Sequence, residues 1–208
     1  GPAAADAIDA IARNGNICRF LHIPIQSASN RILAEMHRDY GISDLERLVS
    51  LASARIPDLG LGCDVIAGFP TESEYDFAAT FDFVKRHPFT NIHAFPYSER
   101  PGTLAAKLAN AFPKPLRSER ARALTALVKD KRKAFARKFK GRKVEVVIED
   151  ASTLSGWTSE YLWCTAGMAN GLKTPPRVVR PGRNLARRSR TEMLVKECDG
   201  DILLADPV

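Results

Sequence analysis

The strongest constraint on the fold of this sequence is a regular alternation of two apolar patterns along its first half. The runs 17–25, 59–67 and 90–98 are short and mostly apolar, which is typical of buried strands. The stretches between them, such as 43–55 and 73–87, repeat apolar residues at the spacing of one helix face. Strands that alternate with helices in this way predict βαβ units and a parallel sheet.

Three further helices are expected. Short ones are predicted at 4–13 and 30–38. A longer helix is predicted over 116–139, with an apolar stripe on one face and Lys or Arg over nearly all of the other. Ser43, with Glu46 three residues later, has the pattern of a capping box and predicts the start of the helix at 43–55.

The apolar pattern changes after residue 140, where alternation with a period of two replaces the helical spacing. This change predicts a small all-β module of the barrel class. The domains are therefore expected to be 1–139 and 140–208. Strand-like stretches in the second domain lie at 143–150, 156–166, 177–180, 192–197 and 201–205.

Basic residues gather in two clusters of a chain whose formal net charge is +7. One cluster covers 117–143, and the other covers 177–190 within a stretch rich in Pro, Gly and Arg. Two such clusters predict a polyanionic partner, most often a nucleic acid. The alternative is a solvated helix face followed by an exposed loop.

Membrane insertion and secretion are not expected. No run approaches the roughly 18 consecutive apolar residues that a membrane helix needs, and the first residues carry no basic n-region. The four cysteines, which form no CxxC pair, are expected to be reduced thiols of a cytoplasmic protein; they are Cys18, Cys63, Cys164 and Cys198. The chain begins without Met, and we interpret it as a piece of a longer protein.

Polar stretches follow each of the three predicted strands, at 26–29, 68–72 and 97–103. In parallel sheets, ligands bind at the carboxyl ends of the strands, so these stretches predict a ligand site. His22 and His93, which lie within strands, are interpreted as core histidines rather than ligands.

Gln26 and Arg38 carry polar groups suited to a small charged ligand. The amide of Gln26 both donates and accepts, and the guanidinium of Arg38 can bind a carboxylate with two hydrogen bonds. The alternative for Arg38 is a surface ion pair with Asp39 or Glu35.

Asp64, Gly68 and Tyr97 are candidates of a different kind. A carboxylate in mid-strand, as at Asp64, is costly unless it is bonded, so it indicates either a ligand contact or a buried polar network. Gly68 allows close approach of a ligand to the backbone. Tyr97 is either a contact to ligand or a core aromatic, and Glu72 is either a site residue or an acid in the first turn of a helix.

Three separate motifs then resemble one family. They are LHIPIQSASNRILAEMHRDY at 21–40, GCDVIAGFPTESEYDF at 62–77 and HAFPYSERPGTLAAKL at 93–108. In this order they resemble the second half of a radical S-adenosylmethionine tRNA methylthiotransferase of the MiaB-like family. The stretch GWTSEY at 156–161 resembles the family's C-terminal TRAM domain.

The resemblance implies the C-terminal part of a partial (βα)6 radical S-adenosylmethionine barrel, followed by a TRAM-like β-barrel that binds RNA. Family members add a methylthio group at C2 of a modified adenosine beside the tRNA anticodon. The full-length enzyme uses S-adenosylmethionine and two 4Fe-4S clusters. The cysteine motifs that hold those clusters are not in this sequence, so this piece alone is expected to bind no cluster and to be inactive.

The resemblance also implies roles for individual residues. No catalytic residue and no metal ligand is expected in this chain. Residues expected to bind the cofactor are Gln26, Ser27, Arg38, Asp64, Gly68 and Tyr97. Because Lys and Arg neutralise phosphates and aromatic rings stack on bases, residues expected to bind RNA are Arg142, Lys143, Trp157, Tyr161, Arg187, Arg188 and Arg190. The alternative for Trp157 is core packing.

The stretch HAFPYSERPGT at 93–103 is more similar to the branch that acts on N6-threonylcarbamoyladenosine at position 37. The expected partner is the anticodon stem-loop of a tRNA, in the cytoplasm, and the sequence does not specify the sulfur donor or the reductant. The alternatives are the branch that acts on N6-isopentenyladenosine, a non-catalytic RNA-binding paralogue, and a branch that modifies a ribosomal protein.

Overall fold

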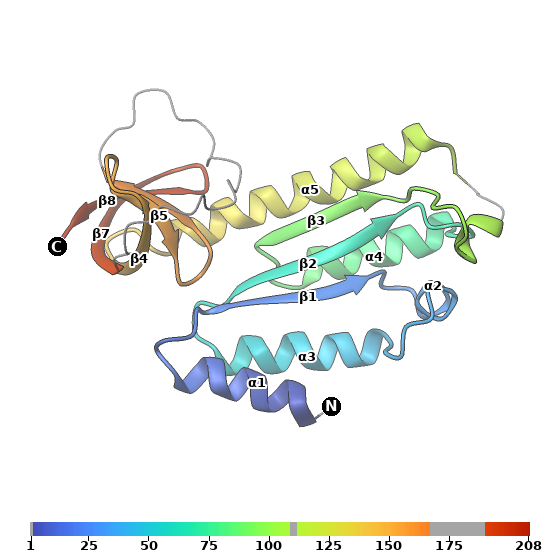
Figure 1. Cartoon of the computed structure of the whole chain (residues 1–208), viewed down its shortest axis with the longest axis horizontal. Helices are drawn as coiled ribbons and strands as arrows, with labels where there is room; N and C mark the ends of the chain where they lie inside the picture. The colour runs from blue at the N-terminus through green and yellow to red at the C-terminus, as the bar shows by residue number, and fades with distance from the viewer. Residues whose placement is uncertain (1, 109–111, 167–189) are drawn as a thin grey trace. The chain divides into compact units, whose positions relative to one another are not determined.

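The computed structural model describes residues 2–108, 112–166 and 190–208 (Figure 1). The chain forms two compact units, Gly1–Asn14 with Phe20–Lys131 and Gly15–Arg19 with Arg132–Val208. The division falls inside a long helix, α5 (Lys114–Arg137), whereas the sequence placed the domain boundary at 139/140.

The first unit is built on a parallel sheet, as the alternation of patterns predicted. Its strand order is β1-β2-β3, so β2 lies in the middle and pairs in parallel with both neighbours (Figure 1). Helical segments precede and follow each strand, which gives the βαβ order. The bounds are α1 Pro2–Arg13, β1 Phe20–Gln26, α2 Asn30–Glu35, α3 Ile42–Arg55, β2 Gly60–Ala67, α4 Glu74–Arg86, β3 Asn91–Pro96 and a 3-10 turn Ala105–Lys107.

The starts of α4 and α3 are both fixed by capping interactions, and the one at α3 overturns an expectation. The hydroxyl of Ser73 accepts from the backbone N–H of Asp76, whose carboxylate accepts from the N–H of Ser73, so α4 begins with a capping box. The predicted cap at Ser43 is wrong, because the N-cap of α3 is Gly41, two residues earlier. There the carboxylate of Asp44 accepts from the N–H of Gly41.

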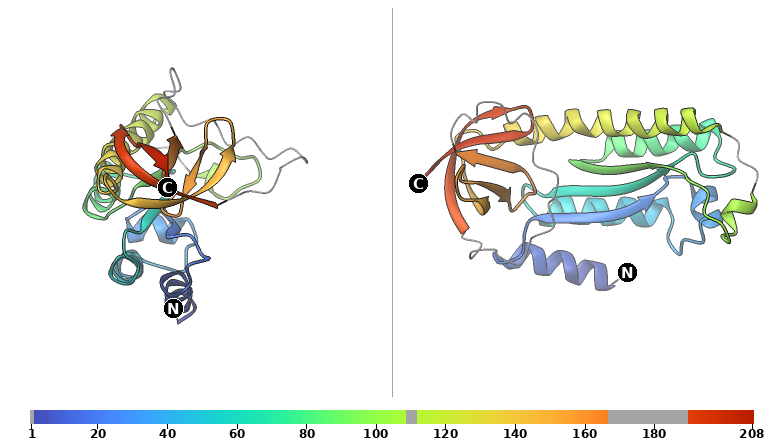
Figure 2. Two further views of the ribbon diagram at one scale, coloured as in Figure 1. Left: turned by 90° about the vertical axis from the view of Figure 1, so that its left-hand side faces the viewer. Right: turned by 45° about the horizontal axis from the view of Figure 1, so that its top comes forward.

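The two faces of the sheet differ in character. On one face Ile25, Leu61 and Val65 are buried in a core to which α1, α3, α4 and α5 all contribute (Figure 2). The alternate residues point to the other face, which we call the open face, and among them His22 and Asp64 remain partly exposed. The open face is therefore the polar side of the sheet.

The second unit contains a closed barrel with the strand order β4-β5-β6-β8-β7. Neighbouring strands are antiparallel except for β6 and β8. The predicted strand-like run at 156–166 divides into two strands around a turn, and the predicted strand at 177–180 lies outside the described residues. The bounds are β4 Lys143–Asp150, β5 Ser155–Thr158, β6 Trp163–Ala166, β7 Arg190–Asp199 and β8 Ile202–Pro207.

Inward residues of the alternating strands fill the barrel. Val146, Met193 and Leu203 are fully buried there, and Phe135 and Phe139 pack against the same cluster. Among the described residues, no helix combines the length and the apolar character that crossing a bilayer requires.

One glycine of the barrel has no room for a side chain. A Cβ at Gly156 would lie 1.9 Å from the carbonyl oxygen of Val147 on the paired strand β4. We therefore expect Gly156→Ala to lower the free energy of unfolding of the barrel by at least about 2 kcal/mol. Gly15→Ala, in the same unit but with nothing within 4 Å of its Cβ, is the matched control. Chemical denaturation that shows equal stability for both variants would contradict this packing.

Candidate functional site

Two adjoining cavities lie at the carboxyl ends of the strands in the first unit. The first cavity has a volume of about 550 Å³, and its wall includes Gln26, Asp64 and Tyr97. The second cavity, of about 690 Å³, is lined by Arg38 and other residues that follow α2 and β2. Both are within the size range of small-molecule sites, and they share Ile66, Thr103 and Ala105 as a common wall. The cavities adjoin the polar stretches that follow the strands, so the predicted ligand site there stays a prediction.

Gln26 ends β1 in an unusual backbone conformation. Its φ is 62°, and the register with β2 shifts between Ile23 and Gln26. A left-handed residue other than glycine costs on the order of 1 kcal/mol, so the surrounding contacts must hold it. The N–H of Ser27 donates to the carbonyl of Ile25 and closes this sharp turn. The turn directs the side chain of Gln26 to the wall of the first cavity.

Ser27 lies on the other side of this turn. Its fully buried hydroxyl is 3.2 Å from the hydroxyl of Thr80 on α4, and it accepts from the N–H of Ser29. The side chain of Ser27 thus contacts the helix side of the sheet, and a contact with cofactor would have to come from its backbone.

Tyr97 follows β3 and has a buried hydroxyl. The N–H of Tyr97 donates to the carbonyl of Ala67, and its ring meets that of Phe69 edge-on at 5.6 Å. The hydroxyl oxygen has no hydrogen-bond partner within the described part of the chain. Leaving such a group unpaired costs about 1–3 kcal/mol. Tyr97 also belongs to the wall of the first cavity.

Glu72 holds the turn between β2 and α4. Its carboxylate is 1% exposed on a relative scale, accepts from the N–H of Gly68 at 2.9 Å and pairs with the guanidinium of Arg120 at 2.7 Å. Burial raises the pKa of Glu72, and the hydrogen bonds from Gly68 and Arg120 oppose that rise. Glu72 precedes Ser73, the N-cap of α4, so it is not an acid of the first helical turn. Its contacts make it a structural clamp on the turn.

Gly68 is the residue that the turn requires. Its φ is 76°, and a Cβ there would lie 2.4 Å from the side chain of Arg117 on α5. The close approach that the sequence assigned to a ligand is therefore made by Arg117. The same guanidinium donates to the carbonyl of Tyr97 at 3.1 Å and pairs with Glu99 at 2.8 Å.

Asp76 joins the ends of β1 and β2. Its carboxylate accepts from the hydroxyls of Ser29 and Ser73 and pairs with Arg31. Burial alone would raise the pKa of Asp76, but these hydrogen bonds dominate and hold it well below its usual range. Arg31 also donates to the carbonyl of Thr71, so one network fixes the loops that follow both strands.

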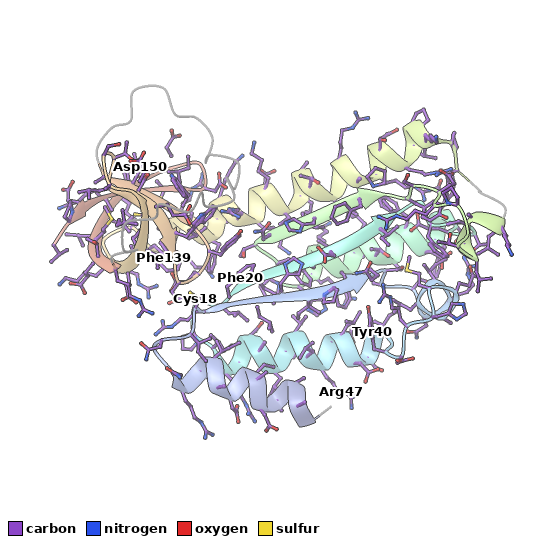
Figure 3. The ribbon with its side chains drawn as sticks, viewed as in Figure 1. Cys18, Phe20, Tyr40, Arg47, Phe139 and Asp150 are labelled. Carbon is purple, nitrogen blue, oxygen red and sulfur yellow. The ribbon has the colours of Figure 1, made fainter. Side chains whose placement is uncertain are left out.

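Arg38 lies on the exposed loop between α2 and α3, in the wall of the second cavity. Glu35, one of the two acids considered as its partner, instead pairs with Arg31 at 2.9 Å. The loop is attached to β1 by Tyr40, whose hydroxyl donates to the carbonyl of Pro24 at 2.6 Å (Figure 3).

Asp64 lies within ion-pair distance of two histidines on the open face. Its Oδ1 is 3.0 Å from Nε2 of His22 and 3.2 Å from Nδ1 of His93. The interpretation of both histidines as core residues is therefore wrong, since they lie on the partly exposed side of the sheet. Alternation along the strands could have revealed this cluster, because alternate residues of a strand point to opposite faces of the sheet. In the observed register, positions 22, 64 and 93 all point to the open face.

The cysteines do not offer a site for an iron–sulfur cluster. Cys63 is buried in β2 and Cys164 in the barrel, and burial raises the pKa of both thiols, that of Cys164 to about 12. In the described residues, no group of three possible metal ligands contains a cysteine.

In the second unit, two residues predicted to bind RNA lie against each other. The rings of Trp157 and Tyr161 stack at 4.6 Å with an angle of 11° between their planes. Tyr161 has a φ of 63°, and Arg132 supports this turn by donating to the carbonyl of Tyr161 and pairing with Asp201.

Basic residues of the barrel are largely balanced by acids on the paired strands. Lys143 pairs with Glu192 at 2.8 Å, and Arg190 lies 3.5 Å from Glu145. The guanidinium of Arg142 lies over the ring of Phe139. The predicted RNA-binding residues Arg187 and Arg188 lie outside the described residues.

Comparison of the sequence with those of known proteins finds relatives that are similar to most of this chain. No family model matches the chain. It is 41% identical over 145 residues to the tRNA-2-methylthio-N(6)-dimethylallyladenosine synthase of Corynebacterium efficiens, a match that covers 70% of this chain and 28% of that protein. It is 40% identical over 144 residues to the threonylcarbamoyladenosine tRNA methylthiotransferase MtaB of Aquifex aeolicus, covering 69% of this chain and 35% of that protein.

A third relative, MtaB of Bacillus subtilis, is 34% identical over 164 residues, which are 76% of this chain and 36% of that protein. All three relatives carry the names of tRNA-modifying enzymes. Relatives at 34% to 41% identity are thus tRNA methylthiotransferases of the MiaB and MtaB types, which supports the MiaB-like family that the motifs predicted. The chain spans 28% to 36% of the length of these relatives.

The clamp at Glu72 can be tested through its partner. Arg120→Met leaves a buried carboxylate without its cation, so we expect a loss of about 3–5 kcal/mol in the free energy of unfolding at pH 7. Without its cation, the buried carboxyl of Glu72 would have a higher pKa in the folded variant than in the unfolded chain. Burial already raises the Glu72 pKa of the folded wild type above the ordinary value of about 4.3, so the deficit of the variant should grow as the pH rises above that raised pKa.

The matched control is Arg122→Met, which removes an exposed cation from the same helix. Urea denaturation at pH 5 and pH 8 separates the two variants. Equal, small and pH-independent losses for both would show that Glu72 and Arg120 do not clamp the turn.

Proposed function

We propose that this chain is part of a radical S-adenosylmethionine enzyme that adds a 2-methylthio group to a modified adenosine in tRNA. The observation that carries the proposal is the identity of 34% to 41% with enzymes named for this chemistry. The order of a parallel sheet followed by a small barrel supports it. Because the chain spans only part of its relatives, the activity is proposed for the whole protein, and this piece alone is expected to be inactive.

We propose that β1, β2 and β3 are the last three strands of a partial (βα)6 barrel. In such a barrel the polar open face would line the interior, and the helices would form the outside. The buried positions on the helix side and the partly exposed His22 and Asp64 on the open face support this arrangement.

The two cavities fit S-adenosylmethionine by their chemistry. A ligand with an apolar-faced base, a hydroxylated sugar and a charged amino-acid end needs adjoining apolar and polar walls. Gln26, Asp64 and Tyr97 line the first cavity and would bind polar atoms of the ligand there, with the Tyr97 side chain turning its buried hydroxyl toward the ligand, while Arg38 in the second cavity would bind a carboxylate. When bound, S-adenosylmethionine would supply the methyl group and, with a cluster held outside these residues, the radical.

The protein residues would bind and orient this ligand. The network of Asp76 and the clamp of Glu72 fix the loops after β1 and β2, which keeps the cavity walls in place before the ligand enters. In this proposal Gly68 and Ser27 shape the turns, and their backbone atoms border the ligand.

We favour N6-threonylcarbamoyladenosine at position 37 as the substrate, on the motif HAFPYSERPGT at 93–103. N6-isopentenyladenosine is the second candidate, because the relative from Corynebacterium efficiens is named for the dimethylallyl form. The identities of 41% and 40% do not separate these branches.

We further propose that the barrel is a TRAM-like module that binds the anticodon stem-loop. The stacked pair Trp157 and Tyr161 offers a flat outer face for a base. Arg142, Lys143, Arg190 and the predicted residues Arg187 and Arg188 would supply positive charge. To bind phosphate, Lys143 and Arg190 would have to leave their carboxylate partners.

The reaction is tested by mass spectrometry of nucleosides from tRNA of cells with and without the gene that encodes this chain. We expect 2-methylthio-N6-threonylcarbamoyladenosine to disappear with the gene and its unmethylthiolated precursor to accumulate. Loss of the isopentenyl form instead would keep the family and overturn the branch. Unchanged levels of both would contradict the proposed reaction and favour a non-catalytic RNA-binding role.

The RNA platform is tested by replacing one aromatic. Trp157→Leu should weaken binding of an anticodon stem-loop by about 1–3 kcal/mol, because it removes a stacking face, whereas Trp157→Phe should retain most of the affinity. Tyr75→Leu, at an aromatic of the first unit that is 82% exposed, is the control. Fluorescence anisotropy that gives equal affinities for Trp157→Leu and the wild type would exclude the platform.

A further inference from the structure

Three side chains that can bind metals meet on the open face of the sheet. His22 comes from β1, Asp64 from β2 and His93 from β3, so each of the three neighbouring strands contributes one. One possible ligand atom from each lies within 4.8 Å of the others. Because paired strands form a stiff sheet, the three positions are fixed relative to one another by backbone hydrogen bonds.

The distances within this group are close to those that a bound cation requires. Two ligand atoms at about 2.0–2.1 Å from a tetrahedral metal are separated by about 3.3 Å. The observed separations from Oδ1 of Asp64 are 3.0 Å to Nε2 of His22 and 3.2 Å to Nδ1 of His93. On metal binding, each of these two separations would lengthen by a few tenths of an ångström, and the two imidazole rings would turn toward each other.

The surroundings leave room for the ligands and access for an ion. A Cβ at Gly62 would lie 2.6 Å from Nδ1 of His22, so the absence of a side chain there creates the space for that imidazole. The side chains of His22, Asp64 and His93 are 31%, 28% and 58% exposed. Water can therefore reach the group and complete the coordination of a cation. In the described part of the chain, the ion partners of Asp64 are these two histidines.

We propose that His22, Asp64 and His93 form a binding site for a divalent first-row transition metal of the zinc class. Two imidazoles and one carboxylate are ligands that Zn²⁺, Ni²⁺ and Fe²⁺ accept, whereas Mg²⁺ and Ca²⁺ prefer oxygen ligands alone. Three protein ligands leave at least one coordination position for water or for an oxygen or nitrogen atom of another ligand. The site adjoins the first cavity, because Asp64 belongs to the wall of that cavity.

This inference does not rest on the proposed function, since metal binding is measured with neither tRNA nor S-adenosylmethionine present. It also differs from an iron–sulfur site, because it contains no thiolate. Failure of the tRNA experiment would leave the metal site standing, and failure of metal binding would leave the proposed reaction standing.

The test is a calorimetric titration with Zn²⁺ of the 208-residue chain, from which a chelator has first removed bound metal. We expect one equivalent to bind, and we expect His93→Gln and Asp64→Asn each to weaken the affinity by tenfold or more. The control is His37→Asn, which removes an exposed imidazole from a left-handed position that Asn tolerates, and which should bind Zn²⁺ as the wild type does. Circular dichroism checks that each variant is folded.

Co²⁺ spectra separate this site from adventitious binding to cysteine. Weak d–d absorption without a thiolate charge-transfer band, lost in His93→Gln, supports the proposal. A thiolate band, an affinity that neither His93→Gln nor Asp64→Asn changes, or the absence of stoichiometric Zn²⁺ binding would each overturn it.

Discussion

The buried ion pair between Glu72 and Arg120 is the interaction on which the candidate site depends most. It fixes the turn after the central strand by binding the N–H of Gly68, and one turn earlier on α5 Arg117 fills the space over Gly68 and holds the carbonyl of Tyr97. Buried ion pairs contribute little net stability, but they are costly to break on one side. Here the pair sets the geometry of two strand ends with residues from a single helix.

Much of the fold could be predicted, because apolar residues repeat at helical spacing in some segments and at strand spacing in others. The parallel sheet, the long helix and the small barrel all follow from spacing of apolar residues, as β2 and β4 illustrate. Local polar contacts could not be predicted in the same way. The start of α3 moved from Ser43 to Gly41 because Asp44, rather than Glu46, caps the backbone.

The candidate site was predicted at the level of strand ends and not at the level of contacts. An acid that binds a ligand and an acid that holds a turn look alike in sequence, so Glu72 could not be told from a ligand-binding residue until its partner from α5 was known. The cluster of His22, Asp64 and His93 depends on the register of three strands, which the sequence does not specify. In the barrel, the acids that balance Lys143 and Arg190 lie on other strands for the same reason.

The central claim is that the first cavity serves the methylthiolation of tRNA, and the hydroxyl of Tyr97 tests it most directly. Because this buried hydroxyl has no partner among the described residues, Tyr97→Phe should leave the free energy of unfolding unchanged or raise it. The decisive measurement is the 2-methylthio nucleoside content of tRNA in cells whose only copy of the gene carries Tyr97→Phe, beside cells carrying Asp82→Asn at an exposed position of α4. The account predicts a strong fall for Tyr97→Phe at normal protein level and full modification for Asp82→Asn, whereas full modification in both would contradict it.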